Sequence, residues 1–185
     1  MSTGLIIVDI QNDYFPGGRM ELVGMEEAGK NAQKLLALFR KNKWPTFHIQ
    51  HVAPSEKAPF FRPDTAGAEI HQSVAPEADD KVIQKHFPNS FRETLLAEAL
   101  KNNDVEQVVI CGAMSHMCID ATTRAAADLG FKCTLIHDAC ATRGLVFGDE
   151  KIAAAAVHGA FMAALGGGYA KVQNLDEYMT SIDTH

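Results

Sequence analysis

Residues 108–122 read VVICGAMSHMCIDAT, and the hydrophobic pattern changes within this segment. The first four residues are apolar and mostly β-branched, which is typical of a short buried strand. After Gly112 the spacing becomes that of one helix face. The residues expected on that face are Cys118, Thr122, Ala125 and Leu129. The segment therefore predicts a strand that passes into a helix, with Cys118 in the first turn of the helix.

The position of Cys118 makes it the leading candidate for a nucleophile. Backbone N–H groups at the start of a helix have no partner within the helix and carry positive partial charge. Such an environment stabilises a thiolate and lowers the pKa of a cysteine. We therefore expect a reactive thiol at Cys118.

Strands and helices alternate along the rest of the chain. The expected strands are Leu5–Val8, Pro45–Val52, Lys81–Lys85, Val108–Cys111, Lys132–His137 and Ala170–Val172. The expected helices are Glu26–Lys41, Phe91–Lys101, the segment from Cys118 to Leu129, Asp149–Leu165 and a last turn from Leu175. This order predicts a single α/β domain over residues 1–185, with a doubly wound, mostly parallel six-stranded sheet and helices on both faces.

Composition limits the possible partners. The chain has 185 residues, of which 46% are hydrophobic and 22% charged, with a formal net charge of −6. Such a chain can bury a full core, and its acidity disfavours nucleic acid as a partner. The sequence shows neither a secretory signal nor an apolar run long enough to span a membrane. We expect a cytoplasmic protein.

The four cysteines form two C-x6-C pairs, Cys111 with Cys118 and Cys133 with Cys140. This spacing is wider than structural zinc sites use, and disulfides are not expected without a secretory signal. The simplest interpretation of Cys111, Cys133 and Cys140 is that they are small buried apolar residues.

Three chemically active side chains follow the ends of predicted strands. Asp9 ends the first strand, Lys85 ends the third, and Cys118 lies just beyond the fourth. Ligands of open parallel sheets bind at the carboxyl ends of the strands, so the three groups are expected to converge there. They form either a catalytic set, with Asp9 as base and Lys85 as its electrostatic support, or a buried ion pair beside an inert thiol.

Several motifs resemble those of the isochorismatase-like cysteine hydrolases. The matching elements are VDIQND at residues 8–13, Lys85, Ser90-Phe91 with Thr94 and Leu95, Gly112-Ala113 through Cys118, and Asp138 to Thr142. The elements occur in the family's order and span nearly the whole chain. The resemblance implies the Rossmann-like fold of that family and favours the catalytic interpretation.

The resemblance implies that the protein hydrolyses an amide through a thioester intermediate. This reaction needs no cofactor. Cys118 would attack a carboxamide or ureido carbonyl, and the backbone N–H groups of Met114 and Cys118 would bind the oxyanion. Asp9 would transfer the thiol proton to departing ammonia and then activate water. The family also places a cis peptide bond at the position of Ala113-Met114.

Two departures from related activities are informative. The presence of Cys118 argues against vinyl-ether hydrolysis of the isochorismatase type. Nicotinamidase-like members carry an aspartate and histidine metal set after the second strand, whereas the segment Phe47–Ala53 contains no aspartate, and its His48 and His51 point to opposite faces of a strand. The remaining alternative for a metal is a pair of ligands from His51 and His71. We expect no bound metal.

Other assignments depend on loops. Five aromatic residues are candidates for the wall of an apolar substrate pocket: Tyr14, Phe15, Phe60, Phe61 and Phe91. His116, two residues before Cys118, is either a further substrate contact or a surface histidine. The long irregular region Ala53–Asp80 is expected to serve as a lid, a binding loop or a subunit contact. The family commonly forms dimers or tetramers, so a homo-oligomer is expected.

The sequence thus predicts a cysteine hydrolase of a small-molecule amide-like C–N bond. The alternatives are an ether or ester hydrolase of the same family and a non-catalytic small-molecule binder that keeps the fold. Ser115 presents a conflict, because as a helix cap its hydroxyl would accept from the N–H of Cys118 that the oxyanion needs. We expect Ser115 to turn elsewhere.

Overall fold

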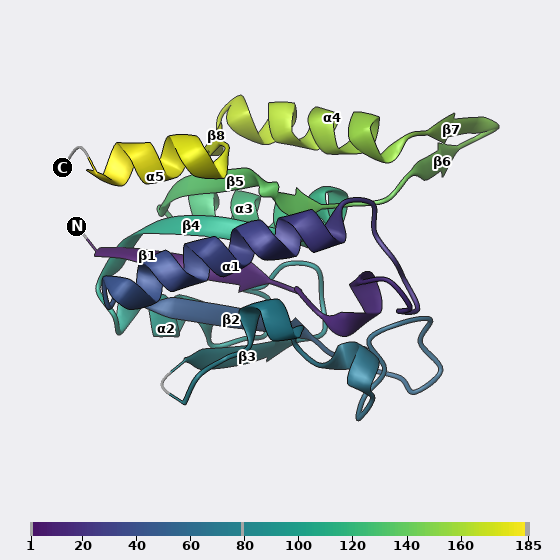
Figure 1. The fold of residues 1–185 in the computed structure, drawn as a ribbon, viewed down its shortest axis with the longest axis horizontal. Helices are drawn as coiled ribbons and strands as arrows, with labels where there is room; N and C mark the ends of the chain where they lie inside the picture. Colours follow the sequence, from purple (N-terminus) through teal and green to yellow (C-terminus); the bar gives the residue numbers. More distant parts are fainter. Residues whose placement is uncertain (1, 79, 184–185) are drawn as a thin grey trace.

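Six parallel strands form one sheet at the centre of the molecule (Figure 1). The structure is a computed structural model and describes residues 2–78 and 80–183. In spatial order the strands are β3-β2-β1-β4-β5-β8. Their bounds are Ser2–Val8 (β1), Thr46–His51 (β2), Lys81–Lys85 (β3), Val105–Ala113 (β4), Lys132–Ala141 (β5) and Ala170–Gln173 (β8).

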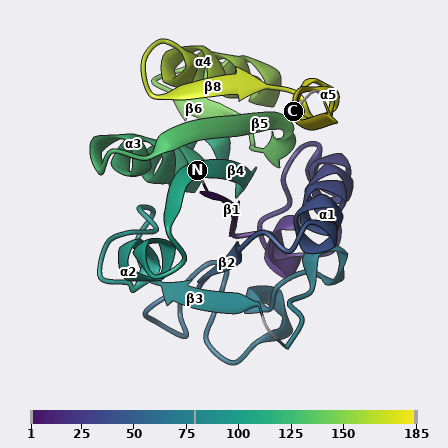
Figure 2. The same cartoon turned by 90° about the vertical axis from the view of Figure 1, so that its left-hand side faces the viewer.

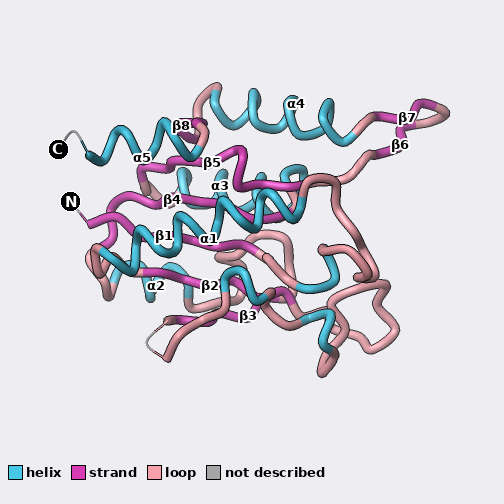
Figure 3. Tube along the Cα trace, viewed as in Figure 1, coloured by secondary structure: helices cyan, strands magenta, loops and turns pink. Residues whose placement is uncertain are grey.

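Helices cover both faces of the sheet, as Figures 2 and 3 show. Helices α1 and α5 pack on one face, and α2, α3 and α4 pack on the other. Their bounds are Met25–Lys41 (α1), Leu96–Lys101 (α2), Asp120–Asp128 (α3), Ala154–Gly166 (α4) and Leu175–Asp183 (α5). The predicted doubly wound α/β fold with six strands is confirmed.

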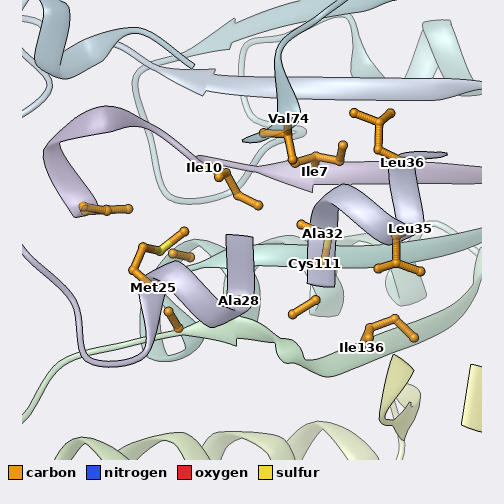
Figure 4. Packing of buried hydrophobic residues seen from close by; sticks show 14 of the residues in the cluster. Ile7, Ile10, Met25, Ala28, Ala32, Leu35, Leu36, Val74, Cys111 and Ile136 are labelled. Atoms are coloured by element: carbon orange, nitrogen blue, oxygen red, sulfur yellow. The ribbon is translucent and has the colours of Figure 1, made fainter. Parts of the chain in front are cut away.

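The central strands are apolar without interruption because both of their faces are buried. In β1, Leu5 and Ile7 face the core beneath α1, whereas Ile6 and Val8 face the core beneath α2 and α3. All four are at most 2% exposed. Figure 4 shows Ile7 and Cys111 of the sheet packed against the residues of α1. Each such side chain contributes about 1.5–3 kcal/mol when it leaves water.

The order of the strands reverses in the middle of the sheet. Chain connections run from β1 outward to β2 and β3 on one side, and from β4 outward to β5 and β8 on the other. Strands β1 and β4 are therefore neighbours at which the winding reverses direction. In such sheets ligands bind beyond the carboxyl ends of the strands at this reversal point.

The helix predicted from Phe91 begins five residues later, at Leu96. Glu93 adopts a left-handed backbone conformation with φ 57°, and the hydroxyl of Thr94 donates to the carbonyl of Ser90. A left-handed residue cannot continue a right-handed helix. The turn formed by residues 90–95 therefore delays the start of α2.

The predicted helix Asp149–Leu165 was wrong at its beginning. Strands Leu145–Phe147 (β6) and Glu150–Ile152 (β7) form an antiparallel hairpin, and α4 starts only at Ala154. Gly148, with φ 59°, supplies the left-handed residue that the hairpin turn needs. The run of alanines that follows obscured this hairpin in the sequence, because alanine strongly favours helix.

The predicted helix face after Gly112 was also partly wrong. Cys118 and Thr122 are buried, but Leu129 is 56% exposed. Residues Ser115–Ile119 form a π-helical turn (η4) before α3 begins. A π turn inserts an extra residue into the helical period, so the spacing from Cys118 does not carry forward along one face.

Among residues 2–78 and 80–183, no helix is long and apolar enough to cross a membrane.

Candidate active site

Asp9 lies at the carboxyl end of β1 and is fully buried. Its backbone is left-handed with φ 52°, a conformation that aspartate tolerates better than most residues. Its N–H donates to the carbonyl of Ile49 in the neighbouring strand, 3.0 Å away. The chain thus turns at Asp9 immediately after the strand ends, above the crevice between β1 and β4.

Lys85, the last residue of β3, is 1% exposed and places its ammonium at the centre of the site. Nζ lies 2.8 Å from Oδ2 of Asp9, 3.3 Å from Sγ of Cys118 and 3.1 Å from Nδ1 of His51. The carbonyl of Phe87 accepts a further hydrogen bond at 3.1 Å. The three predicted residues therefore meet in one place, and the ammonium contacts both the carboxylate and the sulfur.

Cys118 is 5% exposed and belongs to η4, just beyond β4. The peptide bond Ala113-Met114, at the junction between β4 and η4, is cis, as the resemblance implied. At Gly112, with φ 127°, a Cβ atom would lie only 1.9 Å from the carbonyl oxygen of Val8. Only glycine therefore allows β4 to pass so close to β1 and deliver the turn to the crevice.

The expected lowering of the Cys118 pKa was wrong. Burial raises the pKa of this thiol, and the Asp9 carboxylate beside it raises it further, whereas Lys85 acts in the opposite direction. The helix-start argument omitted both the loss of water and the neighbouring negative charge. In the resting site the sulfur is therefore a thiol, and it needs a base to become a nucleophile.

Lys85 keeps its charge despite burial. Loss of water lowers the pKa of the ammonium, but Asp9 and Cys118 raise it by more, and the net pKa is raised. The site therefore contains a buried ammonium–carboxylate pair. Removal of one partner from such a pair typically costs about 3–5 kcal/mol, because the other charge is left alone.

His51 contacts the site, although sequence reasoning assigned it no catalytic contact. It pairs with Lys85 between β2 and β3, and its Nδ1 accepts from the ammonium. Burial lowers the pKa of His51 to about 4, with Lys85 contributing and Asp9 opposing. The imidazole is therefore neutral near pH 7, with its proton on Nε2. The sequence did offer one indication of this contact, because His51 lies at the end of the predicted strand that precedes the strand of Lys85.

Gln11 and Asp13 connect the site to the long loop, a role that the sequence did not indicate. The side chain of Gln11 accepts from the N–H of His51 at 2.8 Å and donates to the carbonyl of Ala68 at 2.7 Å. Asp13 accepts from the N–H of Phe61 at 2.6 Å. Because both polar side chains are buried, their hydrogen bonds fix where the loop crosses the crevice.

Aromatic side chains form one side of the site. Tyr14 and Phe61 are 1% exposed, with ring centroids 4.5 Å apart, and Phe60 packs on both rings. Phe61 also lies 5.9 Å from the ring of His51. Burial raises the pKa of Tyr14, and the Asp9 carboxylate raises it further, so its hydroxyl is neutral.

The four predicted substrate residues occupy different environments. Phe60 belongs to the aromatic wall described above, and His116 lies two residues before Cys118, with Nδ1 2.6 Å from Oγ1 of Thr142. Phe15 stacks on His71 at 3.5 Å, and Phe91 stacks on Phe131 at 6.2 Å. For all four residues the substrate role stays a prediction.

The predicted conflict at Ser115 is resolved as expected. Its hydroxyl is fully buried and lies 3.2 Å from the carbonyl oxygen of Ala141 and 2.9 Å from Nδ1 of His158. The side chain is thus turned towards β5 and α4. It does not cap the turn that carries Cys118.

The residues do not fit a metal ion. In the described part of the chain, one group of three possible ligands comes together, with one donor atom each from Asp9, His51 and Cys118 within 4.8 Å. The Lys85 ammonium already contacts all three residues, and a second cation there would face its positive charge. His71 stacks on Phe15, and His48 lies 3.4 Å from Asp80, so neither joins this group.

A thiol, a carboxylate and an ammonium thus meet beyond the carboxyl ends of the strands in a doubly wound sheet. The family model of the isochorismatase domain matches residues 3–165. The chain belongs to the isochorismatase family and is a hydrolase of that family.

Individual relatives agree with this assignment. YddQ, an isochorismatase family protein of Bacillus subtilis (strain 168), is 49% identical over 179 residues, which cover 97% of this chain and 99% of that protein. A crystal structure of a protein from Oleispira antarctica is 47% identical, with a TM-score of 0.94 over 97% of this chain and 96% of the other. Maleamate amidohydrolase of Pseudomonas putida is 28% identical over 153 residues, 75% of this chain and 72% of that protein.

Proposed function

We propose that this protein hydrolyses a small amide-like C–N bond through a thioester on Cys118. The observation that supports the proposal most strongly is the Lys85 ammonium, 2.8 Å from the Asp9 carboxylate and 3.3 Å from the Cys118 sulfur. This arrangement supplies a nucleophile, a base beside it and a positive charge that stabilises both anionic forms. The amidohydrolase named among the relatives is consistent with it.

In the first half of the reaction, Cys118 attacks the carbonyl carbon of the substrate, and its proton passes to Asp9. The new S–C bond places negative charge on the carbonyl oxygen, which the N–H groups of Met114 and Cys118 bind. As the C–N bond breaks, Asp9 gives the proton to the leaving nitrogen, and ammonia departs. The site returns to an Asp9 carboxylate beside a thioester.

In the second half, Asp9 takes a proton from water, and the resulting hydroxide attacks the thioester carbonyl. The S–C bond breaks, the carboxylic acid is released, and the proton on Asp9 returns to the sulfur. Throughout the cycle Lys85 stays charged and compensates the negative charge that alternates between Asp9 and Cys118. General acid–base catalysis of this kind contributes about 10²–10⁴-fold to a rate.

Two other functions make different predictions. An ether or ester hydrolase of the same family would release an alcohol or ketone and no ammonia. A non-catalytic binder would turn over no member of the panel. The contact between Asp9, Lys85 and Cys118 favours catalysis over binding, because a binder has no need for a base beside a buried thiol.

The substitution Cys118→Ala tests the proposed nucleophile. We expect ammonia release from the wild-type protein with one or more members of a panel of nicotinamide, ureido acids and simple carboxamides. Loss of the sulfur should lower this rate by about 10⁴-fold or more, since the covalent route is removed. The measurement is ammonia release per unit of protein over the panel.

Cys133→Ala is the matched control, because Cys133 is also a buried cysteine but lies on β5 and outside the site. It should keep the wild-type rate. Turnover that survives in Cys118→Ala would exclude the sulfur as the nucleophile.

We also propose a homo-oligomer in which α4 of one copy packs on a second copy. No residue of α4 is charged, although a helix on the surface usually has a charged outer face. The exposed residues of α4 are instead small and uncharged: Ala155, Ala156, Gly159, Ala160, Ala163, Ala164 and Gly166. Each copy carries a net charge of −6, so two copies repel each other through their charged surfaces. The uncharged face of α4 is therefore well suited to self-association.

The hairpin β6–β7 extends the same surface. It projects from the body of the molecule next to the start of α4 (Figure 1). Phe147 is 80% exposed, the highest value among the large hydrophobic residues that the structure describes. Val146 follows at 69%, the same value as Leu95. A second copy that covers α4 and this hairpin would remove the exposed apolar area from water. The cytoplasmic location and the single domain of residues 1–185 stay predictions from the sequence.

A further inference from the structure

The hydrogen-bond roles at Ser115 follow from its two neighbours. A hydroxyl has one proton, and the carbonyl oxygen of Ala141 can only accept, so Ser115 donates to Ala141. His158 must then donate to the oxygen of Ser115 from Nδ1, 2.9 Å away. Burial and the nearby His137 lower the pKa of His158, so the ring is neutral, with its proton on Nδ1. His158 comes from α4, 43 residues away from Ser115 in the chain.

Of these two contacts, the one with His158 has the better geometry. The distance of 3.2 Å to Ala141 is long for a bond between a hydroxyl and a carbonyl, which prefer about 2.7–2.8 Å. The distance of 2.9 Å to His158 is ordinary for a ring N–H donor. The imidazole therefore does most to fix the direction in which the Ser115 oxygen points.

Without that restraint, the hydroxyl has an attractive competing partner. Ser115 is the first residue of η4, directly after the N-cap Met114. A serine hydroxyl at the start of a helical turn competes for nearby backbone N–H groups, and the N–H of Cys118 lies three residues later. The same N–H is needed for the oxyanion in the proposed mechanism. A capped N–H would be unavailable to the developing negative charge, and the reaction would lose one of its two donors.

We propose that His158 is a positioning residue that keeps the Cys118 N–H available by holding the Ser115 hydroxyl away from it. This inference rests on the proposed oxyanion role of the Cys118 amide. The hydrogen bonds and ring contacts of His158 involve Ser115 and His137 and do not reach Asp9, Lys85 or Cys118, so Ser115 is its polar connection to the site. The buried Ser115–His158 contact also connects the catalytic turn to α4.

The test compares two reactions of Cys118 in the full-length protein. p-Nitrophenyl acetate acylates the sulfur through an oxyanion, with release of p-nitrophenolate and transfer of the thiol proton to Asp9. Iodoacetamide alkylates the same sulfur at a saturated carbon and forms no oxyanion. The ratio of the two rates therefore measures the oxyanion site separately from the reactivity of the thiol. Peptide mapping assigns both products to Cys118.

We expect His158→Ala to slow acylation by about 10- to 100-fold, since removal of a whole oxyanion donor costs about 10²–10³-fold and a cap competes for it only part of the time. Alkylation should be unchanged. The double variant Ser115→Ala/His158→Ala should recover the acylation rate of Ser115→Ala, because no hydroxyl remains to occupy the N–H. His137→Ala, which removes a neighbouring histidine that does not contact Ser115, should match the wild type.

Other outcomes would overturn the inference. A purely structural role would slow both reactions in His158→Ala, and the double variant would be slower still. Absence of acylation in the wild-type protein would contradict the proposed function instead, and a crystal structure of His158→Ala would then decide the inference by itself. Ser115 Oγ bonded to the Cys118 N–H is the expected result, and Ser115 still bonded to Ala141 would refute it.

Discussion

Lys85 is the common contact of the polar side chains around it. Its ammonium lies 2.8 Å from the Asp9 carboxylate and acts against the burial that raises the pKa of Cys118. Burial lowers the pKa of His51, and Lys85, which donates to its Nδ1, lowers this pKa further. In the proposed mechanism this buried ammonium balances the negative charge of a carboxylate that acts as a base beside a thiol.

The pH dependence of alkylation follows from the raised pKa of Cys118. Iodoacetamide reacts with the thiolate, and a raised pKa means that little thiolate exists at neutral pH. We expect the rate of alkylation at Cys118 to continue rising with pH beyond about 8.5, the ordinary pKa of a free cysteine. Peptide mapping after timed labelling at each pH measures this rate.

Cys118→Ala removes the labelled peptide and serves as the control for assignment. A rate that levels off below about 8.5 would show instead that the thiol has a lowered pKa, as the helix-start argument alone predicts.

The site residues that could be predicted lie at the ends of strands, whereas those that were missed act through hydrogen bonds to residues distant in the sequence. Asp9 and Lys85 end apolar runs, so their place at the edge of the sheet could be predicted. Gln11 and His158 act through hydrogen bonds to residues 40 and 43 positions away, and a single sequence carries no sign of such pairs. The pKa of Cys118 was missed because burial is a property of the folded chain.

Among the elements, strands buried on both faces were predictable and local irregularities were not. A run such as LIIV in β1 has few alternatives to a central strand. The π turn at residues 115–119 and the hairpin β6–β7 depend on backbone conformations that hydrophobic spacing does not report. The site lies on one of these irregularities, because the π turn carries Cys118.

Helix α4 provides the test of the proposed oligomer. We expect the wild-type protein to have at least twice the monomer mass of 20.1 kDa, and Ala160→Glu to reduce it. The new carboxylates would face each other or an apolar partner across the interface, which is unfavourable for a buried charge. Light scattering coupled to size-exclusion chromatography measures the mass.

Ala97→Glu adds the same charge to an exposed alanine of α2 and should leave the mass unchanged. A wild-type protein of monomeric mass, or an oligomer that Ala160→Glu does not disturb, would place the contact elsewhere or exclude it.

At the scale of the whole molecule, the site is a consequence of the sheet. The winding reverses between β1 and β4, so residues 9 and 118, more than a hundred positions apart, meet above one crevice. The long loop of residues 53–80, of which residue 79 lies outside the described part, is tied to the segment after β1 by Gln11 and Asp13. The fold and the proposed catalytic set were predictable together because the motif order specifies the topology, whereas the substrate depends on the shape of this loop.

The most direct test of the central claim is the mass of the protein during turnover. With a carboxamide or ureido acid that releases ammonia, the acid-quenched protein should contain a species heavier by the acyl group, and peptide mapping should place it on the peptide of Cys118. The adduct should disappear when the substrate is exhausted. Steady ammonia release with no adduct on Cys118, or with an adduct on another residue, would contradict the thioester mechanism.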